Sequence, residues 1–305
     1  MNRSTILSSK LTSQNYINAT AAGFIDKIEL RAIDLEINKN DLIENLKSIG
    51  VLFEDARFKN GGYMIKIKSL NGTDTFCQYN HKTNMIHKII LNPSCYSSYY
   101  EFSDDILTLL GNVQDIECLA ISRLDRTVEV SLVFSSVSRG LNVKHKRSKI
   151  AYEFGSGPLT GLSFGKLPSV VKLYDKTLKA NLDFPNTRLE VAQTSQKLQD
   201  ITLAKLKSLW SDQNFYDPTF DHISFNDISL TKPLKRNDEK KLRELEVLFS
   251  YFPYRIIQGR LNSGRNFSRD YQRLIKFTPW DLQPSTIFNI GMRKFFNSDE
   301  PGAEL

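Results

Sequence analysis

Three short stretches of this 305-residue chain gather side chains that can do chemistry. They are residues 118–130 (CLAISRLDRTVEV), 170–176 (VVKLYDK) and 187–193 (TRLEVAQ). Each alternates apolar and polar residues with a period of two, which is the pattern of a strand with one buried and one polar side. The polar sides carry Arg123, Asp125, Thr127, Glu129, Lys172, Tyr174, Lys176, Arg188 and Glu190.

If the three strands lie in one sheet, their polar sides form one face. Carboxylates are the ligands that Mg²⁺ and Mn²⁺ prefer, so we expect a divalent metal ion at Asp125, Glu190 and Glu129. The cations Arg123, Lys172 and Arg188 suit phosphate groups, and predict contacts with DNA. The alternative for any one of these residues is a solvated face, where charged side chains are only cross-strand partners.

Tyr174 is the candidate nucleophile because it lies between two lysines, Lys172 and Lys176. A phenol is unreactive near neutral pH, since its pKa is about 10. Neighbouring cations favour the phenolate and can hold a DNA phosphate for in-line attack. We therefore predict Tyr174 and Lys176 as catalytic residues. The alternative is a half-buried tyrosine of the kind that strands prefer.

Charge and composition narrow the classes of function. The net charge of +7 favours a polyanionic partner such as nucleic acid. The three cysteines, Cys77, Cys95 and Cys118, lack the spacing of a zinc site or of a disulfide framework. No Walker loop or GxGxxG motif supports nucleotide hydrolysis or dinucleotide redox chemistry. No apolar run approaches the roughly 20 residues of a membrane span, so we expect a cytoplasmic protein without a membrane partner.

The order of elements predicts an α+β protein with antiparallel sheets and helices on one face. Residues 1–20 read as a flexible arm, and residues 21–211 as two βαβββ-like halves, 21–115 and 116–211. Strands are expected at 24–37, 63–68, 74–79 and 85–91, and again at 118–134, 148–154, 160–165, 169–176 and 187–193. Residues 212–236 read as a linker.

Residues 237–305 are expected to form a basic, mainly helical segment that binds DNA. Its arginines interleave with Tyr254, Phe267, Tyr271 and Phe277, a mixture that suits contact with phosphates and stacking on bases. The alternative is a solvated helical face that packs by its aromatic side chains. The predicted DNA-binding residues are Arg255, Arg260, Arg265, Arg269 and Arg273.

Taken in order, the motifs resemble the replication initiators of rolling-circle plasmids and filamentous phages. The matching positions are Arg123, Asp125 and Glu129; Phe164, Gly165 and Ser169; Tyr174-Asp175-Lys176; and Arg188 to Val191. The resemblance covers roughly residues 24 to 210. Where the family commonly has YFG, this chain has Ser163-Phe164-Gly165, which removes one tyrosine candidate. Tyr152 and Tyr271 are the reserve nucleophiles.

The resemblance implies a metal-dependent DNA endonuclease and strand transferase. Such an initiator binds a replication origin, often as a dimer, and nicks one strand through a tyrosine. The products are a 5′-phosphotyrosyl link and a 3′-hydroxyl that primes synthesis, with a host helicase or replisome as further partner. Two alternatives stay open. The chain can be an origin-binding initiator or regulator that does not cut, or a globular protein whose basic charge is incidental.

Overall fold

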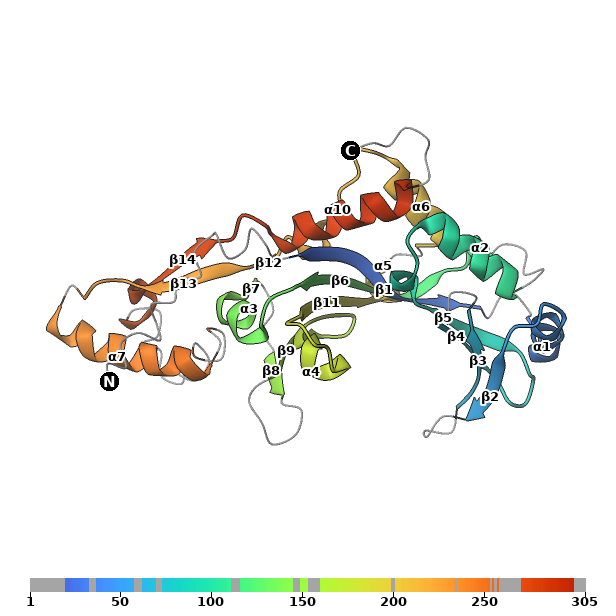
Figure 1. Cartoon of the computed structure of the whole chain (residues 1–305), viewed down its shortest axis with the longest axis horizontal. Coiled ribbons are helices and arrows are strands. Elements are labelled where there is room, and N and C mark those ends of the chain that lie inside the picture. The colour runs from blue at the N-terminus through green and yellow to red at the C-terminus, as the bar shows by residue number, and fades with distance from the viewer. Residues whose placement is uncertain are drawn as a thin grey trace.

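The computed structural model describes residues 20–32, 37–57, 62–69, 73–110, 116–144, 149–152, 160–198, 201–233, 235–252, 254, 257 and 270–298. It is a mixed structure of helices and antiparallel strands. The molecule is elongated, with a large sheet in its middle and a smaller lobe at one end (Figure 1). Among the described helices, none has both the length and the apolar composition needed to cross a membrane.

One ten-stranded sheet organises the main body, in the order β2-β3-β4-β5-β1-β6-β11-β10-β9-β8. The long strands β1 and β6 pair at its centre, and each is followed outwards by the later strands of its own half. The first half contains β1 (Ala21–Arg31), α1 (Lys39–Ser48), β2 (Phe53–Arg57), β3 (Tyr63–Lys68), β4 (Asp74–Tyr79), β5 (Ile86–Leu91) and α2 (Tyr99–Leu110).

The second half has the same arrangement of strands around the centre. It contains β6 (Ile121–Val130), α3 (Phe134–Gly140), β7 (Asn142–Val143), β8 (Lys149–Tyr152), β9 (Gly161–Lys166), β10 (Ser169–Asp175), α4 (Lys176–Ala180), β11 (Thr187–Thr194), α5 (Ser195–Leu198) and α6 (Leu203–Ser211). In each half, four further strands extend the sheet from the central strand. The sequence predicted only three of these in the first half, because β2 (FEDAR) is short and largely exposed and so lacks a clear apolar alternation.

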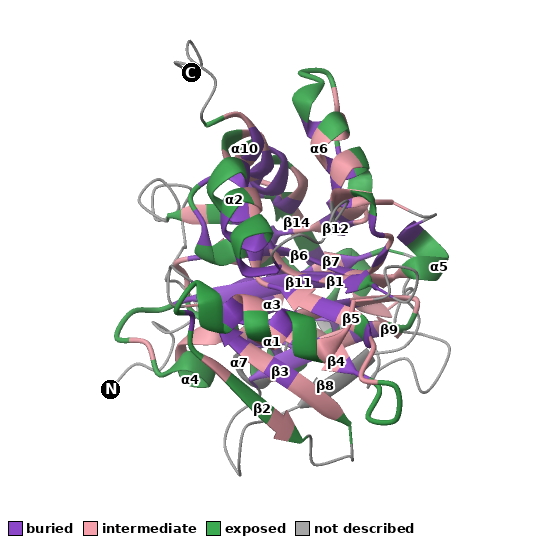
Figure 2. Cartoon of the chain, turned by 90° about the vertical axis from the view of Figure 1, so that its right-hand side faces the viewer, coloured by how far each residue is buried: buried purple, intermediate pink, exposed green. Residues whose placement is uncertain are grey.

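The two faces of the sheet differ as the alternation predicts. Leu124 and Val128 of β6 face the main core, together with Leu189 and Val191 of β11. Helices α2, α6 and α10 (Pro284–Asn297) cover this face (Figure 1). Figure 2 shows the buried residues concentrated in the central strands and on the inner sides of α2 and α10. The opposite face carries the polar side chains that the sequence singled out.

The chain after α6 departs from the expected linker and helical segment. Phe220 and Phe225, within the expected linker, are buried in the main core. The chain then runs out through β13 (Asn226–Leu230) to α7 (Arg236–Tyr251), returns through β14 (Ile275–Pro279), and ends its described part with α10. β12 (Ile223–Ser224) pairs with β7. The described residues between 226 and 279 therefore form the end lobe, which has a small core of its own around Leu245 and Phe249.

Helix α10 belongs to the main body rather than to the lobe. Ile287, Phe288 and Met292 pack into the main core. The helix lies so close to β1 that a Cβ atom at Gly23 would overlap the backbone of Phe288, and one at Gly291 would overlap the carbonyl of Gly23. Only glycine fits at this crossing. The ribbon of β13 and β14 thus leads into the lobe and back to a helix that is fixed on the sheet.

Candidate functional site

The three stretches singled out in the sequence form neighbouring strands, in the order β6-β11-β10. Arg188 lies opposite Glu129 on one side and opposite Tyr174 on the other. Glu190 likewise lies opposite both Thr127 and Lys172. Because residues directly opposite each other share a face of a sheet, the expected meeting of the three polar sides is confirmed. Their roles in chemistry stay predictions.

Each of the three predicted metal ligands is held by a cation. Arg123 donates two hydrogen bonds to Asp125, both of 2.7 Å. The Lys172 Nζ lies 2.6 Å from Glu190. Arg188 binds Glu129 at 2.5 Å.

Arg188 also binds a carboxylate that the sequence analysis did not consider, Asp26 of β1, at 2.9 Å. The register between β1 and β6 shifts between Ile25 and Lys27, which is the bulge that contains Asp26. A bulge in an alternating strand has no clear sequence signal, so only the register between β1 and β6 reveals it. Arg188 is therefore shared between two carboxylates, Glu129 and Asp26.

The middle of this face is well buried although it is charged. Asp125 is 3% exposed, Glu190 is 6% exposed and Arg188 is 8% exposed. Burial raises the pKa of Asp125, Arg123 opposes this rise, and the neighbouring charge of Glu190 adds to it. Buried charges persist only where partners compensate their lost hydration, and the ion pairs supply those partners.

Tyr174 lies inside this group of charges and is only 3% exposed. Burial raises the pKa of its phenol, while the adjacent Arg188 acts to lower it. The Lys179 Nζ lies 4.3 Å from the centre of the tyrosine ring. The phenol is thus protonated and covered in this state. Among the neighbouring charges, Arg188 favours a phenolate, whereas the carboxylates of Glu190 and Asp26 oppose one.

Lys176 is the first residue of α4, directly after β10. Its neighbour Asp175 caps the helix by accepting a hydrogen bond from the backbone N–H of Leu178. Burial lowers the pKa of Lys176, and repulsion from Arg188 lowers it further. Lys176 therefore loses its proton more readily than an exposed lysine does.

The donor set does not fit a divalent cation as it is arranged. A metal ion needs carboxylate oxygens that turn toward one point. Here the carboxylates of Asp125, Glu190 and Glu129 turn toward Arg123, Lys172 and Arg188. In the part of the chain that the structure describes, no three His, Cys, Asp or Glu side chains come close enough together to hold an ion.

Of the other predicted DNA-binding residues, Arg273 is described by the structure, and it lies away from this face. Arg273, in the end lobe, binds the buried carboxylate of Asp238. Arg255, Arg260, Arg265 and Arg269 fall outside the described residues. Of the reserve nucleophiles, Tyr152 ends β8, and Tyr271 lies in the lobe, where it donates a hydrogen bond of 2.6 Å to Glu244. Burial and Glu244 raise the pKa of Tyr271 to about 12.

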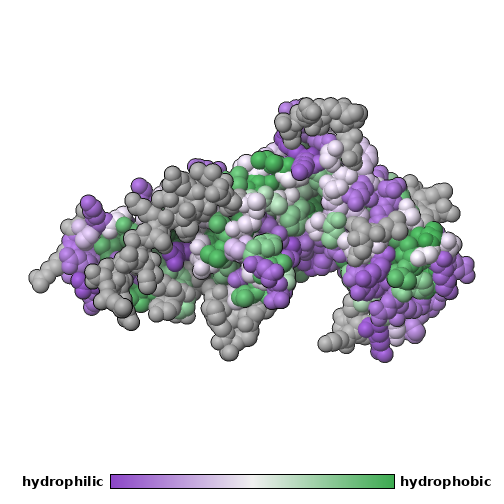
Figure 3. Space-filling model, viewed as in Figure 1, coloured by the Kyte–Doolittle hydropathy of each residue, from purple (hydrophilic) through white to green (hydrophobic). Residues whose placement is uncertain are grey.

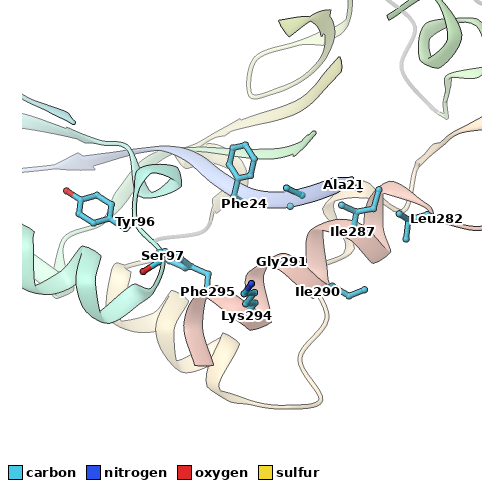
Figure 4. A pocket seen from close by; sticks show the side chains of 12 residues that line it. Ala21, Phe24, Tyr96, Ser97, Leu282, Ile287, Ile290, Gly291, Lys294 and Phe295 are labelled. Atoms are coloured by element: carbon cyan, nitrogen blue, oxygen red, sulfur yellow. The ribbon is translucent and has the colours of Figure 1, made fainter. Parts of the chain in front are cut away.

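A cavity of about 390 Å³ lies on the other side of β1, between that strand, Tyr96, Ser97 and α10 (Figure 4). Its walls are mostly apolar, with Lys294 as the charged group. Figure 4 shows the ring of Phe24 pointing away from α10, toward the polar face of the sheet. The guanidinium of Arg188 lies 5.4 Å from the centre of that ring. The cavity therefore contributes none of the charged side chains of the candidate site.

Comparisons with known proteins add little. No family model matches the chain, and no curated protein sequence matches it. One solved structure with a partial likeness is that of a rolling circle replication initiator protein from Geobacillus stearothermophilus. The likeness has a TM-score of 0.39 at 11% sequence identity, and covers 72% of this chain and 91% of that chain. A likeness at this level does not establish a shared fold or function.

Proposed function

We propose that this chain is a replication initiation protein of the rolling-circle type, which binds DNA at an origin and cleaves one strand through Tyr174. The observation that carries the proposal is the position of Tyr174 on one sheet face, opposite Arg188 and close to Lys179. The order of the three motifs along the chain agrees with it. The resemblance to known initiators then supplies the reaction class.

In the proposed reaction, Arg188 and Lys172 bind oxygens of the scissile phosphate. Arginine suits this role because its guanidinium matches phosphate with two parallel hydrogen bonds. The Tyr174 oxygen forms a bond to phosphorus as the bond from phosphorus to the 3′-oxygen breaks. The phenol proton passes to Lys176 when that lysine is in its deprotonated form, and the 3′-oxygen takes a proton from water. The products are a 5′-phosphotyrosyl link and a free 3′-hydroxyl.

The reaction requires the site to open. Tyr174 must become accessible, and phosphate must replace Glu129 or Asp26 on Arg188. An exchange of one anion for another keeps the buried guanidinium paired, so it avoids the cost of an unpaired buried charge. Because the carboxylates do not fit a metal ion as arranged, the proposal gives no step to Mg²⁺ or Mn²⁺. Cleavage is therefore to be measured with and without each ion.

The test uses a supercoiled plasmid that carries the DNA flanking the gene. The wild-type protein is expected to convert it to the nicked form and to remain covalently attached to the 5′ end, which gel electrophoresis after denaturation detects. Tyr174→Phe is expected to abolish the adduct and to keep DNA binding. Tyr100→Phe, an exposed tyrosine of α2, is the control. An adduct that survives in Tyr174→Phe but is lost in Tyr152→Phe or Tyr271→Phe would move the nucleophile.

A second candidate function is an origin-binding initiator or regulator that does not cut. The observations that favour it are the burial of Tyr174 and the pairing of every predicted metal ligand. This candidate predicts salt-sensitive origin binding without nicking under any metal condition. Binding as a homodimer and recruitment of a host helicase are expected under either candidate, and sedimentation and pull-down with purified helicase measure them.

A further inference from the structure

The polar face of the sheet continues across the first half, where it carries a different set of side chains. Phe76 of β4 lies opposite Lys66 of β3 and opposite Ile90 of β5. Two residues further along β4, on the same face, Gln78 lies opposite Met64 and Lys88. The residues of this surface, which we call the platform, are Met64, Lys66, Phe76, Gln78, Lys88 and Ile90.

The platform is not part of the protein core. The other face of the same strands is fully buried at Ile65, Cys77 and Ile89. Phe76, Ile90 and Met64 are half-buried, and belong neither to the main core nor to the hydrophobic residues packed against it. Helices therefore cover one side of these strands, while the platform leaves an aromatic ring and two aliphatic side chains partly open to solvent. In Figure 3 the lower part of the end that contains β2, β3 and β4 is mainly hydrophilic at its surface, and a notch separates it from the middle of the molecule.

Two lysines flank the ring of Phe76. Lys66 pairs with Asp74 at 3.0 Å, and Lys88 pairs with Glu29 at 3.1 Å. Both lysine side chains are about one-third exposed, at 33% and 34%. Ion pairs at such positions contribute little to stability, so phosphate can replace the carboxylate at small cost. The lysines lie on the strands to either side of Phe76, and neighbouring strands are about 4.8 Å apart.

We propose that the platform binds single-stranded DNA, with a base stacked on Phe76 and phosphates at Lys66 and Lys88. Every base has an apolar face that can stack on an aromatic ring, but in a duplex that face is covered by the neighbouring bases. A partly exposed ring between two cations therefore suits an unpaired strand better than a duplex, which is contacted mainly at its phosphates. Gln78 lies beside the ring, where its amide can reach a base edge.

The platform is continuous with the candidate cleavage site. Glu29 of β1 lies opposite both Ile90 of β5 and Arg123 of β6, so the two surfaces meet across the centre of the sheet. A strand on the platform would lead toward Tyr174. The choice of DNA over other single-stranded nucleic acid rests on the proposed function, whereas the stacking and charge arguments do not.

The test measures binding of a fluorescent oligo-dT to the full chain by anisotropy at low salt. Phe76→Leu nearly conserves volume and apolar character but removes the stacking surface. Its affinity is expected to fall about ten-fold, because one base stacked on an aromatic ring contributes on that order. Phe76→Trp is expected to bind at least as tightly as wild type. The control is Tyr100→Leu, an exposed aromatic residue of α2 on the helical side, which should bind as wild type.

A second measurement does not depend on any variant. Oligo-dT containing 5-iododeoxyuridine is crosslinked by light to the wild-type protein, and a crosslink in the peptide that carries Phe76 is expected. Unchanged affinity in Phe76→Leu together with a crosslink elsewhere would overturn the proposal, as would wild-type protein that binds no oligo-dT. A dimer that dissociates in Phe76→Leu would assign the platform to a second copy of the chain and also overturn it.

The platform and the cleavage proposal can fail separately. If the wild-type protein nicks DNA and forms the Tyr174 adduct, but the Phe76→Leu variant binds oligo-dT as tightly as wild type, only the platform proposal fails. If the Phe76→Leu variant loses affinity for oligo-dT, but the wild-type protein never nicks DNA, only the cleavage proposal fails. Absence of all DNA binding refutes both.

Discussion

The two halves of the sheet have the same strand arrangement, but they differ in how deeply their charged side chains are buried. In the second half, Tyr174, Arg188 and Glu129 lie in register across β10, β11 and β6. The first half has corresponding strands, β4, β5 and β1, with its own in-register row. That row consists of Gln78, Lys88 and Arg31.

The difference in exposure between these rows is large. The Arg188 side chain is 9% exposed and is shared by two carboxylates, whereas the Lys88 side chain is 34% exposed and pairs with Glu29. Buried charges hold a fixed geometry because separation is costly, and exposed pairs exchange partners readily. The second half is therefore suited to chemistry on a bound phosphate, and the first half to reversible binding.

The largest expected effect comes from removing the central cation of each row. Arg188→Ala leaves Glu129 and Asp26 facing each other without their shared partner, and should lower the free energy of unfolding by about 3 kcal/mol. Lys88→Ala removes a part-exposed pair, and should cost less than about 1 kcal/mol. Urea unfolding followed by circular dichroism measures both. Equal losses in the two variants would contradict the contrast between the halves.

A smaller effect is expected in the pH dependence of stability, with opposite signs in the two halves. Burial raises the pKa of Asp125 above its ordinary value of 3.8. Its contribution to stability is therefore complete below that value and is lost as pH rises through the folded pKa. For Asp55 of β2, burial acts upward, but hydrogen bonds from Lys39 and Tyr79 outweigh it and lower the pKa. Its contribution is present above 3.8 and is lost as pH falls through the folded pKa.

These signs are tested with Asp125→Asn and Asp55→Asn, each compared with wild type by urea unfolding over a series of pH values. The stability of wild type relative to Asp125→Asn should decrease as the pH rises through the acid range. The stability of wild type relative to Asp55→Asn should decrease as the pH falls. Parallel curves for the two variants would show that the carboxylates are in similar surroundings.

The smallest expected effect is on the salt dependence of oligo-dT binding. Affinity for a single strand falls as salt rises, and each phosphate contact makes the slope of log affinity against log salt concentration steeper by about 0.7. Lys66→Gln should reduce the slope by about that amount, and Lys205→Gln, an exposed lysine of α6, should leave it unchanged. A slope that changes equally in both variants would mean that the platform has no special part in binding.

The alternation of apolar and polar residues alone determined which side chains share a face in β6, β10 and β11. This prediction succeeds because the period of two is a property of each strand and needs no partner. The same reasoning placed β3, β4 and β5 close to their observed positions. It missed β2, whose five residues are largely exposed, and did not reveal the bulge that brings Asp26 to Arg188.

Only the tertiary structure decided which charges meet and which are covered. The pairing of Arg188 with Asp26, the burial of Tyr174 and the return of α10 to the sheet all depend on strand order and on packing between distant segments. The sequence specified acids, cations and a tyrosine on one face, because alternation is local. Glu129 and Glu190 point toward Arg188 and Lys172 rather than toward a metal ion, and this is a matter of side-chain geometry across neighbouring strands, which no single stretch of sequence contains.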